Sequence, residues 1–100
     1  MLAYKRMSKE EYIIFVSIIE TLVVEHIPIG TKTVHFVIEL AKYGTDKPIA
    51  NSYDKMGDIF NYAINTLHKT ISTLYRVGLV KKDSKDYYYI SSEKINELHK

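Results

Sequence analysis

The sequence contains no cysteine, which excludes a disulfide scaffold and any zinc site built on thiolates. It also lacks a long uncharged apolar run. The most hydrophobic stretch, 12–24, is interrupted by Ser17, Glu20 and Thr21, whereas a membrane-spanning helix needs about 20 apolar residues. Because no small-residue cleavage site follows Val24, we expect no secretory signal and a cytoplasmic protein.

Motifs that carry catalysis are missing as well. The sequence has no glycine-rich phosphate loop, no nucleophile elbow, no HExxH pair and no Cys–His combination. The histidines lack metal-ligand spacing, and the paired carboxylates Asp54 and Asp58 are expected to be solvated. We therefore expect no enzymatic activity, no catalytic residue, no metal and no cofactor.

The charge is small but unevenly distributed. The chain of 100 residues has the composition of one globular domain and a formal net charge of only +2. Between Asn61 and Lys85, however, Asp83 is the only acidic residue. The basic residues of this segment are Lys69, Arg76, Lys81, Lys82 and Lys85. A basic stretch on a nearly neutral chain is typical of a nucleic-acid footprint.

The first predicted helix starts at a capping box formed by Ser8 and Glu11 and continues to about His26. Its apolar residues cover more than the roughly 100° stripe that packs on a single core. The surplus either completes the core of a monomer or pairs with a second copy, and we favour the homodimer. The expected dimer interface consists of Tyr12, Phe15, Val16, Ile19, Leu22 and Val23.

A second helix is expected to be capped by Thr31 or Thr33 and to end at Tyr43. Gly44 then occupies the position of a C-cap glycine. In the loop that follows, 47–50 could form a short strand.

From Ser52 onward the sequence gives clearer signals for the starts and ends of helices. Ser52 can cap a short helix, and a three-residue turn at 61–63 separates it from a longer one. Gly78 ends this longer helix. Its apolar residues lie at helical spacing on a single face and are Ile64, Leu67, Ile71, Leu74 and Tyr75.

The remaining segments predict a β-hairpin and a last helix. The runs 79–82 and 87–90 are separated by a turn and read as two antiparallel strands. The tyrosines at 87–89 alternate across the second strand, so at least one should pack inward. Ser91 or Ser92 can cap a short helix through Leu98.

The stretch 52–82 resembles the core of winged helix-turn-helix transcriptional regulators of small prokaryotic, archaeal or viral type. The resemblance rests on the capped helix, the tight turn and the element Leu-x-x-x-Gly-Leu-Val at 74–80, and with flanking elements it covers about 31–92. Gly57 stands where this family more often has Ala. Asn61 stands where the family often has Gly, and Asn also tolerates a left-handed backbone.

This resemblance implies a mainly α fold with a β-hairpin (α+β), a winged helix-turn-helix with an additional N-terminal helix. We expect one structural domain with three parts. They are a tail and apolar dimerisation helix at 1–30, the winged helix-turn-helix at 31–92 and a short C-terminal helix at 93–100.

The resemblance also implies that the longer helix enters the major groove of DNA and that the hairpin lies on the backbone. With Leu67 and Ile71 inward, helix geometry places several polar residues outward, and Asn65 could contact adenine. His68 flanks this face and either packs or touches DNA. The expected DNA-binding residues are Ser52, Tyr53, Asn65, Thr66, Lys69, Thr73, Arg76, Lys81, Lys82 and Lys85.

The main hypothesis is a dimeric, sequence-specific transcriptional regulator that binds double-stranded DNA. Its two-fold symmetry implies an inverted-repeat operator with half-sites about one helical turn, or a multiple of it, apart. Two alternatives remain open: an architectural or replication-associated DNA binder, and a winged-helix adaptor that binds another protein. The short chain leaves little room for a sensor domain, so a small-molecule effector would have to bind at the dimer interface.

Overall fold

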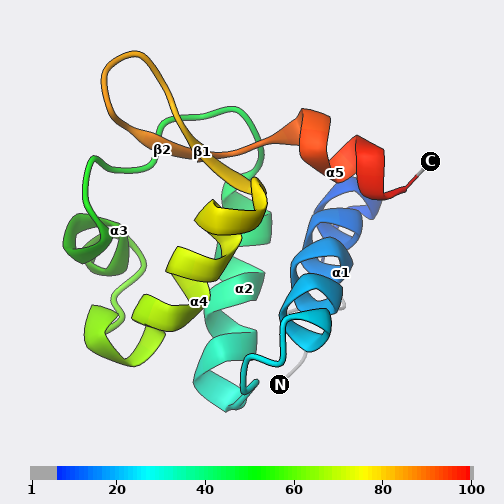
Figure 1. The fold of residues 1–100 in the computed structure, drawn as a ribbon, viewed down its shortest axis with the longest axis horizontal. Helices are drawn as coiled ribbons and strands as arrows, with labels where there is room; N and C mark the ends of the chain where they lie inside the picture. The colour runs from blue at the N-terminus through cyan, green and yellow to red at the C-terminus, as the bar shows by residue number, and fades with distance from the viewer. Residues whose placement is uncertain (1–6, 100) are drawn as a thin grey trace.

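A computed structural model describes residues 7–99, apart from the side chains of Ile64 and Thr66. Within this range five helices and one antiparallel hairpin form an α+β fold (Figure 1). The elements are α1 (Lys9–Val24), α2 (Thr31–Tyr43), α3 (Tyr53–Ile59), α4 (Ile64–Val77), β1 (Val80–Lys82), β2 (Tyr88–Ile90) and α5 (Ser92–Leu98). None of the helices in the described range is long and apolar enough to cross a membrane.

Helix α1 begins at the predicted capping box. The Ser8 hydroxyl accepts a hydrogen bond from the Glu11 amide at 3.1 Å, and the Glu11 carboxylate accepts one from the Ser8 amide at 3.0 Å. The inner face of α1 buries Ile14, Ile18 and Leu22 against α2, α4 and α5. The first helix is therefore a full member of the core.

The predicted cap of α2 is wrong. Gly30, with an extended backbone, is the N-cap, and no side chain caps this end. Thr31 is already the first helical residue, and Thr33 is buried one turn into the helix. At the other end the prediction is confirmed, because Gly44 follows Tyr43 with a φ of 98°.

The connection between α3 and α4 follows the predicted local signals. The Ser52 hydroxyl accepts a hydrogen bond from the Lys55 amide at 3.1 Å and caps α3. Asn61 turns the chain with a φ of 63°. Gly78 ends α4 in the left-handed region, with a φ of 90°. These three residues fix where the two helices start and stop.

The hairpin pairs Val80 with Ile90 and Lys82 with Tyr88. Its turn is closed by the Asp83 carboxylate, which accepts hydrogen bonds from two backbone amides of the loop. The strand that was expected at 47–50 is reduced to a single bridge, in which Ala50 pairs with Tyr88. The loop between α2 and α3 therefore lies along the outer edge of β2.

Helix α4 occupies the centre of the molecule. It packs against α1, α3 and β1, with α3 and the hairpin on one side and α1 and α5 on the other (Figure 1). The buried core draws residues from every element, and its largest fully buried side chains include Phe36, Ile18, Leu22, Met56, Leu67 and Ile71. The orientation of α4 is set by this core.

Two isoleucines provide a matched test of this core. Ile18 is fully buried, whereas Ile59 at the end of α3 is 50% exposed. We expect Ile18→Ala to lower the free energy of unfolding by about 2–5 kcal/mol, because it leaves a cavity. Ile59→Ala should change it by about 0.5 kcal/mol or less. Urea denaturation checks both values, and an equal loss in the two variants would contradict the position of α1.

Candidate nucleic-acid interface

Helix α4 has one buried and one exposed side. Leu67, Ile71 and Leu74 are buried, so the opposite side faces solvent. The residues that are exposed or half-buried on that side recur every three or four positions and are Asn65, His68, Lys69, Ser72, Tyr75 and Arg76. We call this set the α4 outer stripe. It combines amide, imidazole, ammonium, hydroxyl and guanidinium groups, which are the donors and acceptors that read base edges and phosphates.

The predicted outward position of Thr73 is wrong. Its side chain is only 4% exposed. Thr73 lies about one turn before Val77 on the same side of α4, and Val77 lines a groove with residues of α1. Helix α1 therefore covers the flank that helix geometry alone left open. The side chain of Thr66, also predicted to contact DNA, lies outside the described part of the structure.

The outer stripe contains residues that were missed or left undecided. Tyr75 was assigned to the inner face, yet it is 42% exposed. The sequence pattern does not single out Ser72, and it leaves His68 open between packing and contact with DNA. The spacing from Asn65 to His68, Ser72 and Tyr75 follows the helical repeat and could have identified all three.

A cluster of three tyrosines joins the hairpin to both helices beneath it. Tyr53 of α3 and Tyr75 of α4 both contact Tyr88 of β2, with ring centroids 5.2 and 5.6 Å apart. His68 lies edge-on to Tyr53 at 5.1 Å. Tyr88 is buried, which confirms that at least one of the tyrosines at 87–89 packs inward. We call Tyr53, Tyr75 and Tyr88 the tyrosine cluster.

The cluster gives the Tyr53 side chain a packing role, and the α3 cap engages the Ser52 side chain. The Tyr53 ring packs against its neighbours, and the Ser52 hydroxyl is occupied by the α3 cap. Burial raises the pKa of the Tyr53 hydroxyl, and the neighbouring Tyr88 and Tyr75 hydroxyls raise it further. The Tyr53 ring is therefore a packing group at the edge of the surface, while the expected phosphate contact of Ser52 and Tyr53 through their backbone amides stays a prediction.

The basic residues of the hairpin continue the α4 outer stripe. The ammonium of Lys82 lies 5.1 Å from the centroid of the Tyr88 ring, a cation–π distance. Because Tyr88 also contacts Tyr75, the hairpin and α4 form one continuous surface. Lys85 is exposed in the turn. Lys81 lies 3.5 Å from the carboxylate of Glu93 in α5.

Arg76 is already paired. Its guanidinium donates to the Glu25 carboxylate at 2.7 Å and connects the end of α4 to the C-cap of α1. Exposed pairs of this kind contribute about 0–1 kcal/mol to stability. Arg76 can therefore exchange Glu25 for another anion at little cost.

The outer side of α1 differs from the expected interface at one residue. Leu22 is fully buried against the core, so it cannot contact a second copy, and its assignment to the interface is wrong. Tyr12 and Val23 are 52% and 59% exposed. Phe15 and Ile19 are half-buried, as is Val16, and the first two also pack against the core.

A serine and a histidine meet between α1 and the chain end, 2.5 Å apart at Ser17 Oγ and His99 Nε2. The Ser17 hydroxyl donates its hydrogen to the Ile13 carbonyl at 2.7 Å. The imidazole must therefore be the donor in the first contact, which is the opposite of the polarity that activates a nucleophile. The contact connects α1 to the C-terminal end of the described chain.

Comparison of the chain with protein-family models, with curated proteins and with solved structures finds no match in any of the three. The function must therefore be inferred from the side chains themselves. The α4 outer stripe together with Lys82 and Lys85 brings together exposed or half-buried polar and basic residues that are capable of ligand contact.

The raised pKa of Tyr53 predicts a stability change in alkali. The unfolded chain ionises this phenol near its ordinary pKa of 10.0, while the folded chain keeps it neutral to higher pH. The contribution of Tyr53 is therefore complete below that pH and is lost as pH rises above it. We expect Tyr53→Phe to reduce the fall in the free energy of unfolding between about pH 9 and about pH 11.

Urea denaturation at a series of pH values measures this fall. Tyr87→Phe is the matched control, because it removes the hydroxyl of an exposed tyrosine outside the tyrosine cluster. If the two variants show the same alkaline loss as the unmodified chain, the packing of Tyr53 against the hairpin is wrong.

Proposed function

We propose that this chain is a dimeric, sequence-specific transcriptional regulator that binds double-stranded DNA in the cytoplasm. In this proposal α3 and α4 form a helix-turn-helix, and the β1–β2 hairpin is the wing of a winged-helix fold. The observation that carries the proposal is the continuous surface of the α4 outer stripe with Lys82 and Lys85, on a helix whose other side is buried.

The chemistry of the outer stripe suits the major groove, which is wide enough to admit an α-helix. Asn65 is at the start of α4, where recognition helices of this class contact bases, and its amide can pair with adenine through two hydrogen bonds. Lys69 is one turn further on and can reach guanine or a phosphate. His68 and Ser72 add two groups that donate and accept hydrogen bonds.

The hairpin suits the phosphate backbone. Lys82 and Lys85 are exposed cations on a two-stranded projection beside α4. Arg76 is paired with the half-buried Glu25 and Lys81 with the exposed Glu93, and both could exchange these carboxylates for phosphates. Neutralising phosphates releases counterions from DNA, so binding by these residues should weaken steeply as salt rises.

The outer side of α1 supports the proposed dimer. Tyr12, Val16, Ile19 and Val23 follow the repeat i, i+4, i+7, i+11 and form a stripe on α1. At 3.6 residues per turn this stripe lies opposite the buried residues of α1. Pairing of two such stripes would bury them around a two-fold axis. The two helix-turn-helix units of the dimer would then bind the two halves of an inverted repeat.

Selection of bound sequences from a random duplex pool tests the proposal, and two variants separate its parts. Asn65→Ala should relax discrimination at one base pair by about 1–3 kcal/mol. Lys69→Ala should reduce the salt slope of binding by about 1 if Lys69 contacts a phosphate. Lys42→Ala, at an exposed site in the last turn of α2, is the matched control and should leave both unchanged.

Three other outcomes would contradict parts of the proposal. Uniform weakening by Asn65→Ala, with no selected motif, would indicate an architectural DNA binder. Undiminished salt-dependent binding after Lys69, Arg76, Lys81 and Lys82 are together replaced by Ala would exclude this surface. A chain that binds no duplex but captures a protein through the same surface would be an adaptor.

The dimer has its own test. Val23→Asp places a charge in the proposed stripe, and we expect it to halve the mass measured by sedimentation equilibrium. Val24→Asp is the matched control: this neighbour is 70% exposed but lies outside the stripe, so its variant should remain dimeric. An unmodified chain that sediments as a monomer at every concentration would rule out the dimer.

A further inference from the structure

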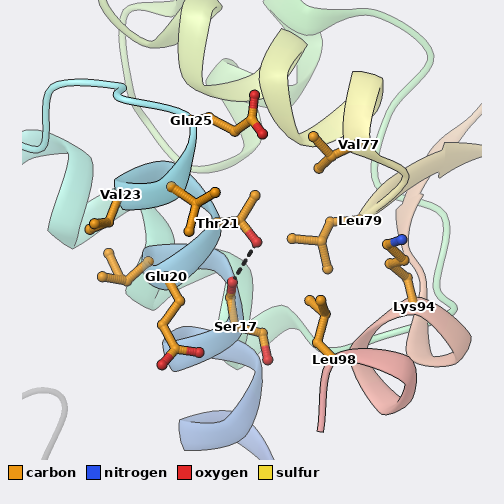
Figure 2. Close-up of a pocket in the computed structure, with 11 residues that line it drawn as sticks. Ser17, Glu20, Thr21, Val23, Glu25, Val77, Leu79, Lys94 and Leu98 are labelled. Atoms are coloured by element: carbon orange, nitrogen blue, oxygen red, sulfur yellow. Dashed lines mark hydrogen bonds between the residues drawn. The ribbon is translucent and has the colours of Figure 1, made fainter.

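A groove of about 560 Å³ lies between α1, the end of α4, the turn that leads into β1, and α5 (Figure 2). Its apolar lining consists of Ile19, Val23, Val24, Val77, Leu79 and Leu98. Figure 2 shows Val77, Leu79 and Leu98 facing Ser17 and Thr21 of α1 across the opening. The volume falls within the roughly 300–1,000 Å³ typical of small-molecule sites.

The hydroxyl donors of this lining are already in use. Ser17 donates to the Ile13 carbonyl, and Thr21 donates to the Ser17 carbonyl at 2.8 Å. The dashed line in Figure 2 marks this second bond. Neither hydroxyl can therefore donate to an occupant of the groove without giving up a backbone partner.

The charged side chains of the lining differ in how closely they are paired with oppositely charged groups. Glu25 is held by Arg76 at 2.7 Å, and Glu20 is an exposed residue on the outer surface of α1. The Lys94 stem runs 4.0 Å from the point where Gly78 would carry a Cβ, so the base of the hairpin supports it. Its ammonium is 3.8 Å from the Glu97 carboxylate, which is longer than a hydrogen bond.

Among the described residues of the lining, Lys94 is therefore the one whose side-chain donors make no hydrogen bond, and its ion pair with the exposed Glu97 is long. We infer that the groove binds a small amphipathic anion, with an aliphatic or aromatic body on the apolar lining and a carboxylate on the Lys94 ammonium. A carboxylate accepts charge-assisted hydrogen bonds from an ammonium, and the apolar body gains from leaving water. This inference does not depend on DNA binding.

The position of the groove places such a ligand beside the proposed dimer stripe and the base of the hairpin. Ile19 and Val23 belong to both the groove and the proposed dimer stripe. Val77 and Leu79 flank Gly78, the residue at which α4 passes into the hairpin. An occupant would therefore contact the base of the hairpin and, in the proposed dimer, lie beside a second copy.

The test uses three eight-carbon probes that differ only in the head group: octanoate and octylamine below their micelle concentrations, and octanol below its solubility limit. We expect octanoate to bind most tightly in calorimetry and to shift the NMR signals of Val77, Leu79 and Leu98. Lys94→Met keeps the apolar stem, so it should weaken octanoate binding by at least about tenfold and leave octanol unchanged. Lys42→Met, on α2, should alter neither.

Leu98→Ser supplies a second variant at a half-exposed site that the core does not need, and it should weaken octanoate and octanol equally. The inference fails if octylamine binds as tightly as octanoate or if Lys94→Met has no effect. It also fails if no probe shifts the NMR signals of the groove residues. If those signals instead change with protein concentration, a second copy of the chain is the occupant.

Discussion

The burial of Leu67, Ile71 and Leu74 determines which side of α4 faces solvent. Each apolar side chain of this size gains about 1.5–3 kcal/mol by leaving water, so α4 cannot rotate about its axis without losing most of that energy. The polar residues on the opposite side are held outward by the same packing. The geometry of the candidate site is thus a consequence of the core.

Helix α1 adds a second constraint to α4. It covers the flank that carries Thr73 and Val77, and the ion pair between Glu25 and Arg76 joins the ends of the two helices. Because α1 covers this flank, fewer side chains of α4 are exposed. The exposed ones lie on the side of α4 that borders the hairpin. On that side Tyr88 packs against Tyr53 and Tyr75, so the hairpin lysines keep a fixed position relative to the α4 outer stripe.

Features set by neighbouring residues were predictable from the sequence. The capping box at Ser8, the left-handed turn at Asn61 and the end of α4 at Gly78 each depend on atoms within a few positions, and all three are confirmed. The hairpin also follows from local patterning, with both strands shorter by one residue at the start.

Features that depend on distant segments were not predictable in the same way. Leu22 and Thr73 are buried in a fold that packs α1 against α2 and α4 at long sequence separation, and no local repeat encodes those contacts. Tyr75 lies at the edge of the hairpin, where its ring contacts Tyr88 and yet remains 42% exposed. The groove between α1 and α5 likewise needs four elements in place before it exists.

The most direct measurement for the proposed DNA surface is an NMR titration of the chain with a duplex taken from the selected pool. We expect the amide signals of Asn65, His68, Lys69 and Ser72 to shift first, together with those of Lys82 and Lys85, and added salt to reverse the shifts. Signals of α2 should stay in place. Shifts confined to the groove between α1 and α5, or none at all, would contradict the account.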